Sequence, residues 1–482
     1  MASGVLEEEI VATASLTDDR RPQRLWAATP LAARLVILRH ARHELARVSD
    51  QLVDAVSPDL ARTHADSYAA EVLPLLAACR FLEEEAAKIL KPRRLGNKGL
   101  PFWLSGLEAT VERVPLGVVL VIAPANYPLF LAGVQTLQAL AAGNAVVWKP
   151  GRGGRMVAEV FQLALLRAGL EDGLLRVTDD STEAAVAELN ARPDKVFFTG
   201  SGAAGRAVLR LAAASAIPVV AELSGCDAVI ALPSADPKRL VEALAFGMRL
   251  NGSATCMAPR RLWLVGSGHD ELLSELKARF AAMDGVELDG RTRAQLAELI
   301  ADAEHRGATV YGNAGAHSLK PLLVLDGQPG MRIAQADVFA PVLTVLRAAS
   351  EDEVVESDRE CPFGLTAAIF GEEKAARELG HRLDVGTVLV NDLIVPTADP
   401  REPFGGRRGS GFGATRGAEG LLEMTAAKVT TVRTDKSTRH YQETGPAHEE
   451  LFRGAIAMGH AATWRERFAG LRRMIAAARK LK

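Results

Sequence analysis

The spacing of apolar residues changes once along the chain, near residue 114. Before that point, segments 30–48 and 68–90 carry apolar residues every three or four positions and contain few glycines or prolines, which predicts helices. After it, short and nearly continuous apolar runs alternate with segments of helical period. This alternation is typical of a parallel β-sheet covered by helices on both faces.

The alternation divides the chain after residue 114 into two similar stretches. The strands expected in the first stretch are 114–124, 144–150, 174–179, 195–200 and 217–223, and its helices are 130–143, 155–169, 183–191 and 203–215. The pattern starts again with a strand at 226–232 and a helix at 237–249, and it runs to a strand at 386–392. The predicted fold class is therefore α/β, with two open-sheet domains.

Two segments do not follow this pattern. Residues 403–417 hold too many glycines for a helix or a strand interior, so we expect either a structured loop near a site or a mobile surface loop. Residues 464–482 carry seven basic residues and one acid, with apolar residues at helical spacing. A basic amphipathic helix of this kind either lies on an anionic membrane, docks on a partner, or packs on its own or a neighbouring subunit.

Composition narrows the functional classes. The 482 residues are 48% hydrophobic and carry a formal net charge of −2, so no basic field favours a nucleic-acid partner. The four cysteines are far apart and have the spacing of neither a zinc site nor a disulfide framework. No uninterrupted apolar run reaches the roughly 18 residues of a membrane span. Acidic residues stand where a signal peptide needs a basic start, so we expect a cytoplasmic protein.

The residues that follow the expected strands are the first candidates for a site, because ligands of such sheets bind beyond the carboxyl ends of the strands. These residues are Asn126, Lys149, Gly200 and Glu222. Gly200 also opens the pattern G-x-G-x-x-G, which predicts either a dinucleotide site or close packing of a helix on a strand. Because at least two strand–helix units precede this pattern, Glu222 need not be a ribose ligand.

Cys256 stands among small residues in the sequence LNGSATCMA, 250–258. Space around a sulfur suits a nucleophile that a substrate must approach. Most free cysteines, however, are small buried hydrophobes. This stretch alone leaves both interpretations open.

Eight motifs, in order along the chain, resemble those of the aldehyde dehydrogenase superfamily. They are PLGVVLVIAPANYPL (115–129), GNAVVWKP (143–150), FFTGSGAAG (197–205), AELSG (221–225), NGSATC (251–256), DVFAPVL (337–343), CPFGLTAAIFG (361–371) and PFGGRRGSGFG (403–413). The resemblance implies two doubly wound open-sheet domains and a small bridging β element for oligomerisation. The implied divisions are a cofactor-binding domain at 1–96 and 117–224, a catalytic domain at 225–425, the bridging element at 97–116 and 426–436, and a C-terminal helical appendage at 437–482.

The resemblance also implies the roles of three residues. Cys256 attacks the aldehyde, the side-chain amide of Asn126 and the backbone N–H of Cys256 stabilise the oxyanion, and Glu222 activates the water that hydrolyses the thioester. The expected reaction is the oxidation of an aldehyde to a carboxylate by NAD or NADP. The alternatives are transfer of the acyl group to coenzyme A, which Glu222 disfavours, and an inactive binding or structural relative. Cys226 is a rival nucleophile, although packing is its favoured role.

The cofactor-binding residues are carried over from the same motifs. They are Ile122, Ala123, Pro124, Lys149, Arg152, Gly200, Ser201, Gly205, Leu223, Asp337 and Phe339. Asp337 is one methylene shorter than the family's glutamate, and Arg152 replaces a glutamate common in NAD-preferring members. Because a guanidinium suits a 2′-phosphate, we expect NADP to be used at least as well as NAD, unless Arg152 points to solvent.

The residues that flank this chemistry include no arginine or lysine. They are Tyr127, Phe130, Val134, Ala254, Thr255 and Met257. This set favours an uncharged, apolar aldehyde. We further expect a homodimer or homotetramer, no nucleic-acid partner and no membrane span, with peripheral membrane contact of the tail left open.

Overall fold

The computed structural model describes residues 20–56, 60, 62–436, 438–441 and 443–481. These residues form two compact units. The larger unit contains the described residues up to Pro92 together with Glu112–Lys428, and the smaller contains Arg93–Val111 and the described residues from Val429 onward. Each unit is described by itself below.

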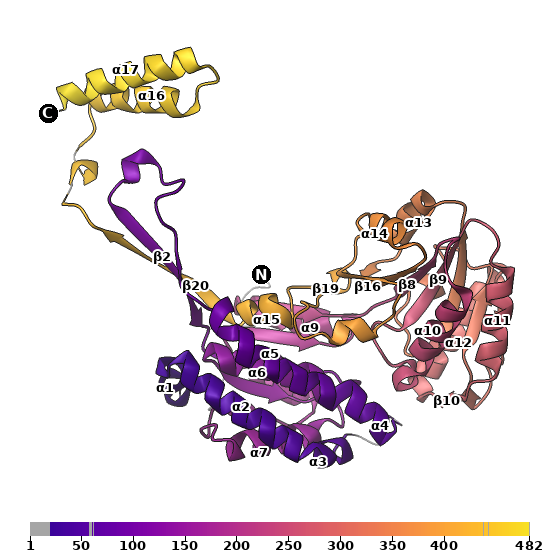
Figure 1. The fold of residues 1–482 in the computed structure, drawn as a ribbon. Helices are drawn as coiled ribbons and strands as arrows, with labels where there is room; N and C mark the ends of the chain where they lie inside the picture. The colour runs from indigo at the N-terminus through magenta and orange to yellow at the C-terminus, as the bar shows by residue number, and fades with distance from the viewer. Residues whose placement is uncertain (1–19, 57–59, 61, 437, 442, 482) are drawn as a thin grey trace, which may run out of the picture. The chain divides into compact units, whose positions relative to one another are not determined.

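A six-stranded sheet organises the first half of the larger unit (Figure 1). Its strands are β3 (Val118–Ile122), β4 (Ala145–Lys149), β5 (Leu175–Val177), β6 (Lys195–Thr199), β7 (Val219–Glu222) and β19 (Gly411–Phe412). They lie in the order β19-β7-β6-β3-β4-β5, and only β19 is antiparallel to its neighbour. All expected strands between residues 114 and 225 are confirmed.

Helices cover this sheet in two groups. The helices of this half are α1 (Arg21–Ala28), α2 (Leu31–Arg47), α3 (Ser49–Asp54), α4 (His64–Ser67), α5 (Leu73–Ile89, preceded by a π-helical turn at Tyr68–Val72), α6 (Phe130–Ala142), α7 (Arg155–Arg167), α8 (Thr182–Asn190) and α9 (Gly202–Ala214). Helix α6 packs on β3 and β4 and is joined by α2 and α5, while α8 and α9 pack on each other and on β3, β6 and β7. Helix α6 is apolar on nearly all sides, as a fully buried helix must be.

A seven-stranded sheet organises the second half of the larger unit. Its strands are β8 (Asp227–Ala231), β9 (Pro259–Val265), β11 (Thr309–Tyr311), β13 (Leu322–Leu325), β14 (Val342–Ala348), β16 (Thr366–Phe370) and β17 (Thr387–Val390). Their order is β11-β13-β14-β9-β8-β16-β17, with β11 alone antiparallel. The accompanying helices are α10 (Pro237–Arg249), α11 (Asp270–Ala281), α12 (Gly290–His305), α13 (Glu351–Asp358) and α14 (Glu373–Gly380). Helix α15 (Gly417–Glu423) instead packs on α5 and α6 of the first half. The predicted α/β fold class, with two open sheets, is confirmed.

Short elements complete the larger unit. They are the strand pairs β10 (Val286–Glu287) with β12 (Ser318–Leu319) and β15 (Phe363–Gly364) with β18 (Arg407–Arg408), and the 3₁₀ turns Leu250–Ser253, Arg332–Gln335 and Val395–Ala398.

The glycine-rich segment 403–417 is not only a loop. It contributes β18 and β19, and β19 is the antiparallel edge of the first sheet. Gly411 has φ +114°, and a Cβ there would lie 1.9 Å from the carbonyl oxygen of Ala221. The expectation that this segment holds too many glycines for a strand was therefore wrong for β18 and β19, because glycine is needed where two backbones approach this closely.

The smaller unit holds a β-ribbon and a helical hairpin. The three-stranded sheet β1-β2-β20 contains β1 (Arg93–Arg94), β2 (Leu107–Pro115) and β20 (Thr425–Arg433), and the hairpin contains α16 (Pro446–His460) and α17 (Trp464–Lys480). Two 3₁₀ turns, Phe102–Leu104 and Arg439–Tyr441, complete it. The helix expected in the tail is confirmed as α17. None of the helices that the structure describes is long and apolar enough to cross a bilayer.

Asn144, between α6 and β4, ties three segments of the larger unit together. Its Oδ1 accepts hydrogen bonds from the backbone N–H groups of Leu116 (2.7 Å) and Gly117 (3.0 Å). Its Nδ2 donates to the carbonyl oxygens of Ala139 (3.1 Å) and Met424 (2.9 Å). The side chain is fully buried, so water does not compete for these four hydrogen bonds.

We expect Asn144→Ala to lower the free energy of unfolding by about 3 kcal/mol, because buried backbone groups lose their partners. Thermal and chemical unfolding measure the change. The control Asn190→Ala alters an exposed asparagine at the end of α8 and is expected to leave stability within about 0.5 kcal/mol. Equal effects of the two substitutions would contradict this account of Asn144.

Candidate active site

Glu222 is the last residue of β7, and the strands on both sides of β7 fix its backbone. Gly200 N–H donates to its carbonyl oxygen at 3.0 Å. The side chain is buried, 4% exposed. Thr415 Oγ1 donates to Oε1, and Thr199 Oγ1 donates to Oε2 at 3.4 Å.

The surroundings of Glu222 raise the pKa of its carboxyl. Burial is the main cause, and the hydrogen bonds of Thr415 and Thr199 and the charge of Arg416 oppose it only in part. A carboxyl with a raised pKa accepts protons more readily near neutral pH than an exposed one does, so it suits a general base.

Cys256 lies between the 3₁₀ turn Leu250–Ser253 and β9 and is partly exposed. Desolvation raises the pKa of its thiol well above the ordinary value. The charges of Glu222, Asp227 and Asp337 raise it further, and the charge of Arg416 lowers it. The thiol is therefore protonated at neutral pH, and a thiol in this state must lose its proton to act as a nucleophile.

Asn126 follows β3 and reaches the segment that precedes Cys256. Its Nδ2 donates to the carbonyl oxygen of Ala254 at 2.9 Å. Next to Asn126 in the chain, the hydroxyl group of Tyr127 forms a hydrogen bond of 2.7 Å with that of Thr255. A side-chain amide has two N–H bonds, so one remains for an oxyanion on the substrate.

Arg62 is a buried residue of this site that the sequence reasoning missed. Its guanidinium pairs with the fully buried Glu71 at 2.6 Å and donates to Asn251 Oδ1 at 2.6 Å and to the carbonyl oxygen of Asn126. It also lies over the ring of Tyr127, 4.5 Å from the centroid. This pair therefore fixes the loop that presents Asn126, and Glu71 neutralises its charge.

Arg416 is the second residue that was missed, and it stands beside Thr415 at the start of α15. It is 5% exposed, and its guanidinium lies 4.5 Å from the ring centroid of Phe404 and 5.6 Å from that of Phe130. One nitrogen donates to the carbonyl oxygen of Thr397, while Nε has no hydrogen-bond partner among the described residues. Its positive charge acts on both Glu222 and Cys256.

Among the carried-over cofactor residues, one group surrounds the start of α9. Ser201 is exposed and caps the helix, accepting from Ala204 N–H at 3.3 Å. A Cβ on Gly205 would lie 2.4 Å from Leu223, so the glycine allows the helix to pack on the residue after Glu222. The close packing of helix on strand is therefore confirmed. The dinucleotide site stays a prediction, for which the exposed N-terminus of the helix is suited because it can bind a phosphate.

A second group follows β3 and β4. Ala123 N–H donates to the carbonyl oxygen of Lys149 at 2.9 Å, which sets Ile122–Pro124 beside the end of β4. The Lys149 side chain is largely buried, and burial lowers its pKa. Arg152 is exposed, as the alternative interpretation required.

Two carboxylates near Lys149 were not anticipated. Asp179 and Asp180 follow β5, and both charges act on the Lys149 ammonium. Asp180 Oδ2 accepts from Gly153 N–H at 2.7 Å, and Asp179 pairs with Arg155 at 3.3 Å. The aspartates follow a different strand from Lys149, so its local motif gave no sign of them.

Asp337 and Phe339 lie in the extended segment before β14. Burial raises the pKa of Asp337, and its Oδ1 is buried without a hydrogen-bond partner in the described part of the chain. A buried, unpaired acceptor of this kind suits a ligand hydroxyl such as that of a ribose. Phe339 is half-buried two residues further on.

The rival nucleophile Cys226 is deeply buried. It is 1% exposed, and the pKa of its thiol lies well above the ordinary value because of the neighbouring Cys361 and of burial. This environment suits a packing residue rather than a nucleophile.

The fold and the site define a class of protein before any comparison. The site combines the desolvated thiol of Cys256, the buried carboxyl of Glu222 and the amide of Asn126. It lies beside a sheet whose helix α9 has an exposed N-terminus. This combination is typical of a dinucleotide-dependent oxidoreductase with a cysteine nucleophile.

Comparisons with known proteins agree with this class. The model of the aldehyde dehydrogenase family matches residues 8–430. A 4,4'-diapolycopene aldehyde oxidase of Methylomonas sp is 31% identical over 423 residues, which cover 85% of this chain and 79% of that protein. The chain belongs to the aldehyde dehydrogenase family. Its activity is the oxidation of an aldehyde to an acid.

Two solved structures extend the comparison to the cofactor. The NADP-dependent glyceraldehyde-3-phosphate dehydrogenase from Bacillus halodurans C-125, complexed with NADP, has a TM-score of 0.80 and 28% identity, covering 87% of this chain and 90% of that one. The Mycobacterium tuberculosis aldehyde dehydrogenase complexed with NAD+ has a TM-score of 0.80 and 23% identity, covering 89% and 92%, and shows a likeness of fold. Each of these two structures is thus of an enzyme complexed with a nicotinamide cofactor.

We expect Arg416→Leu to raise the pKa of both Glu222 and Cys256, because both acids lose a nearby positive charge in a desolvated site. The acid limb of the kcat/KM profile then moves to higher pH, and kcat/KM at neutral pH falls by at least about tenfold. The pH dependence of kcat/KM and the pH dependence of Cys256 alkylation measure these shifts.

Two further variants separate charge from structure. Arg416→Lys keeps the charge and is expected to restore the pH profile, whereas Arg401→Leu removes an exposed arginine of the same region and leaves the profile unchanged. A profile of Arg416→Leu that keeps its wild-type position would contradict the electrostatic role.

Proposed function

We propose that the protein oxidises an uncharged, apolar aldehyde to a carboxylate through a thioester on Cys256 that Glu222-activated water hydrolyses. The observation that carries the proposal is the shared desolvated environment in which the charge of Glu222 acts on the Cys256 thiol. When bound, the nicotinamide supplies the hydride acceptor.

The first half of the proposed reaction forms a bond between sulfur and carbon. The Cys256 thiol adds to the aldehyde carbonyl as its proton passes to solvent water. The free N–H of Asn126 and the backbone N–H of Cys256 donate to the developing oxyanion. The C–H hydrogen then leaves as a hydride, and an acyl thioester remains on Cys256.

The second half breaks that bond. The Glu222 carboxylate takes a proton from a water molecule, whose oxygen attacks the thioester carbonyl. The C–S bond breaks, the carboxylate leaves, and the sulfur recovers a proton. A glutamate in this place supports water, rather than coenzyme A, as the acyl acceptor.

Two features support an apolar substrate. The charge of Arg62 is paired with Glu71, and Arg416 is held between aromatic rings and acts on Glu222, so neither is a free clamp for a carboxylate. The Methylomonas relative is named for a diapolycopene aldehyde. Together these observations favour a long or bulky uncharged aldehyde.

The choice between NAD and NADP depends on opposing charges. The guanidinium of Arg152 supports our proposal that NADP is used at least as well as NAD, because it suits a 2′-phosphate, whereas the exposure of this side chain to solvent opposes it. Asp179 and Asp180 oppose it, since a phosphate near Lys149 would meet two carboxylates.

We also propose a homodimer or homotetramer. Nearly all residues of β20 are exposed, and β20 is an edge strand of a three-stranded ribbon. A strand with neither face covered is poorly stable alone, so a second copy of the chain is the expected cover.

The hydrolytic mechanism predicts that Glu222→Gln lowers the steady-state rate by about 10²–10⁴-fold and accumulates the acyl-enzyme, because thioester hydrolysis loses its base. Mass spectrometry of the quenched enzyme, with an aldehyde panel and either cofactor, detects the acyl group. Hydroxylamine, which needs no general base, is expected to restore turnover. Cys256→Ser is the control and forms no thioester. Full activity of Glu222→Gln, or a wild-type rate that requires coenzyme A, would overturn the proposal.

We predict that two substitutions change the preference between NADP and NAD in opposite directions. Arg152→Glu lowers the ratio of kcat/KM for NADP to that for NAD, and Asp180→Asn raises it, because each changes the charge that a 2′-phosphate meets. Steady-state kinetics with both cofactors give the ratio. A strong NAD preference in the wild type that persists in Arg152→Glu would end the proposal for NADP.

A further inference from the structure

The helical hairpin of the smaller unit packs through its small residues. Helices α16 and α17 lie side by side and antiparallel (Figure 1). A Cβ on Gly454 would lie 2.5 Å from the backbone nitrogen of Met474, and a Cβ on Gly470 would lie 2.4 Å from that of Met458. The two backbones are therefore in near contact, and the interface has no room for large side chains.

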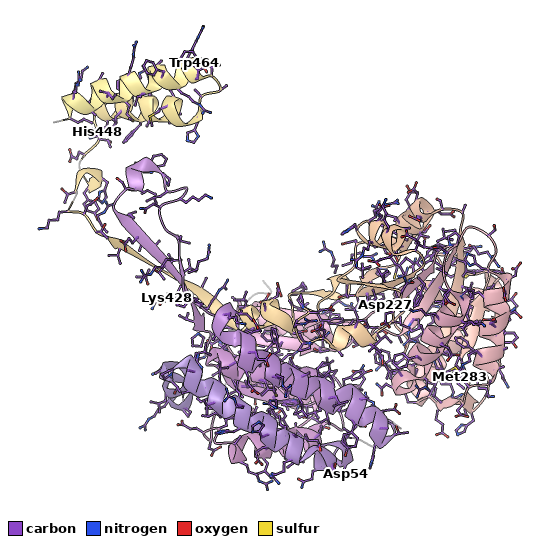
Figure 2. All side chains as sticks on the ribbon, viewed as in Figure 1. Asp54, Asp227, Met283, Lys428, His448 and Trp464 are labelled. Carbon is purple, nitrogen blue, oxygen red and sulfur yellow. The ribbon has the colours of Figure 1, made fainter. Side chains whose placement is uncertain are left out.

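The turn between the helices is also well defined. Thr463 caps α17 by accepting from Glu466 N–H at 3.3 Å, and Glu466 Oε2 accepts in return from Thr463 N–H at 3.1 Å. This reciprocal arrangement fixes the first residue of α17, Trp464, at the end of the hairpin opposite to His448 (Figure 2).

As a consequence, the large apolar side chains of the hairpin face outward. On α17, Trp464 is 73% exposed, Phe468 50% and Ile475 44%, and their spacing of four and seven residues places them on one face. On α16, Phe452 and Ile456 are 51% and 63% exposed and line a groove of about 580 Å³ in the same unit. Such a concentration of exposed apolar groups marks an interaction surface.

Two arginines of α17, Arg465 and Arg472, lie beside these aromatic rings, whereas Arg473 pairs with Glu450 of α16 at 2.7 Å. Residues 464–482 contain seven basic residues and one acid. The guanidinium of Arg465 lies 5.7 Å from the ring centroid of Trp464, and that of Arg472 lies 4.8 Å from the ring centroid of Phe468. Aromatic rings and arginines therefore alternate on one surface, as they do on helices that rest at the boundary between lipid headgroups and acyl chains.

We propose that the hairpin 446–481 docks on the surface of an anionic lipid bilayer, with Trp464, Phe468 and Ile475 in the headgroup region and the arginines on lipid phosphates. The charge excess selects an anionic bilayer over an apolar protein surface, because a protein interface core is depleted of charge. The helices described here do not span the bilayer, so the contact is peripheral.

The first test measures binding of the full-length protein to vesicles of phosphatidylcholine with and without phosphatidylglycerol. Co-sedimentation with the anionic vesicles, lost in high salt and on neutral vesicles, is the expected result. The double variant Trp464→Ser with Phe468→Ser is expected to bind at least about tenfold more weakly. The control Leu73→Ser removes an equally exposed apolar residue of α5 and is expected to bind as the wild type does.

A second variant and its control test how much the arginines contribute to vesicle binding. Arg465→Gln with Arg472→Gln weakens vesicle binding about 30-fold, whereas Arg210→Gln, at an exposed position of α9, leaves it unchanged. Unaltered dehydrogenase activity in solution shows that each variant is folded.

Two outcomes would overturn the inference. One is absence of binding of the wild-type protein to anionic vesicles, or equal binding to neutral ones. The other is a smaller oligomer of the Trp464 and Phe468 double variant in light scattering together with unchanged vesicle binding, which would assign the surface to a second copy of the chain. Neither depends on the aldehyde chemistry, because vesicle binding is measured without substrate.

Discussion

The pairing of β19 with β7 is the constraint on which the site depends. Gly411 stands opposite Glu222, and Ser410 O accepts from Leu223 N–H at 2.9 Å. A strand from position 411 thus completes a sheet whose other strands end by residue 222, and it brings Thr415 and Arg416 to the Glu222 carboxyl. A base fixed in this way keeps its desolvated position without the help of a ligand.

Much of the fold followed from the sequence because buried parallel strands and amphipathic helices leave long, regular patterns. The elements between residues 114 and 225 were predicted from these patterns, and so was the helix α17. Strands of two residues such as β19 have no period to detect, and their glycines predict a loop equally well. Pattern alone therefore placed Glu222 at a strand end but did not show what holds its side chain.

The candidate site was also predicted only in part from the sequence. The resemblance supplied Cys256, Glu222 and Asn126, which carry chemistry in short motifs. Arg62 lies outside all eight motifs, and Arg416 follows the motif 403–413 by three residues. Nothing about either arginine in the sequence predicts burial. Yet the structure places both in the site, because buried carboxylates such as Glu71 and Glu222 require a nearby cation or hydrogen bonds to remain charged.

The raised pKa of the Cys256 thiol also has a protective consequence. Because the thiolate is the form that oxidants attack, a thiol with a raised pKa is oxidised more slowly than an ordinary one. An apolar aldehyde that enters the site also displaces solvent from it. Such an aldehyde also partitions into lipid. An enzyme held at a bilayer surface, as we propose for this one, therefore meets an aldehyde of the proposed kind at a higher local concentration than an enzyme free in solution does. The proposed docking of α17 and the proposed chemistry at Cys256 are consistent with each other for this reason.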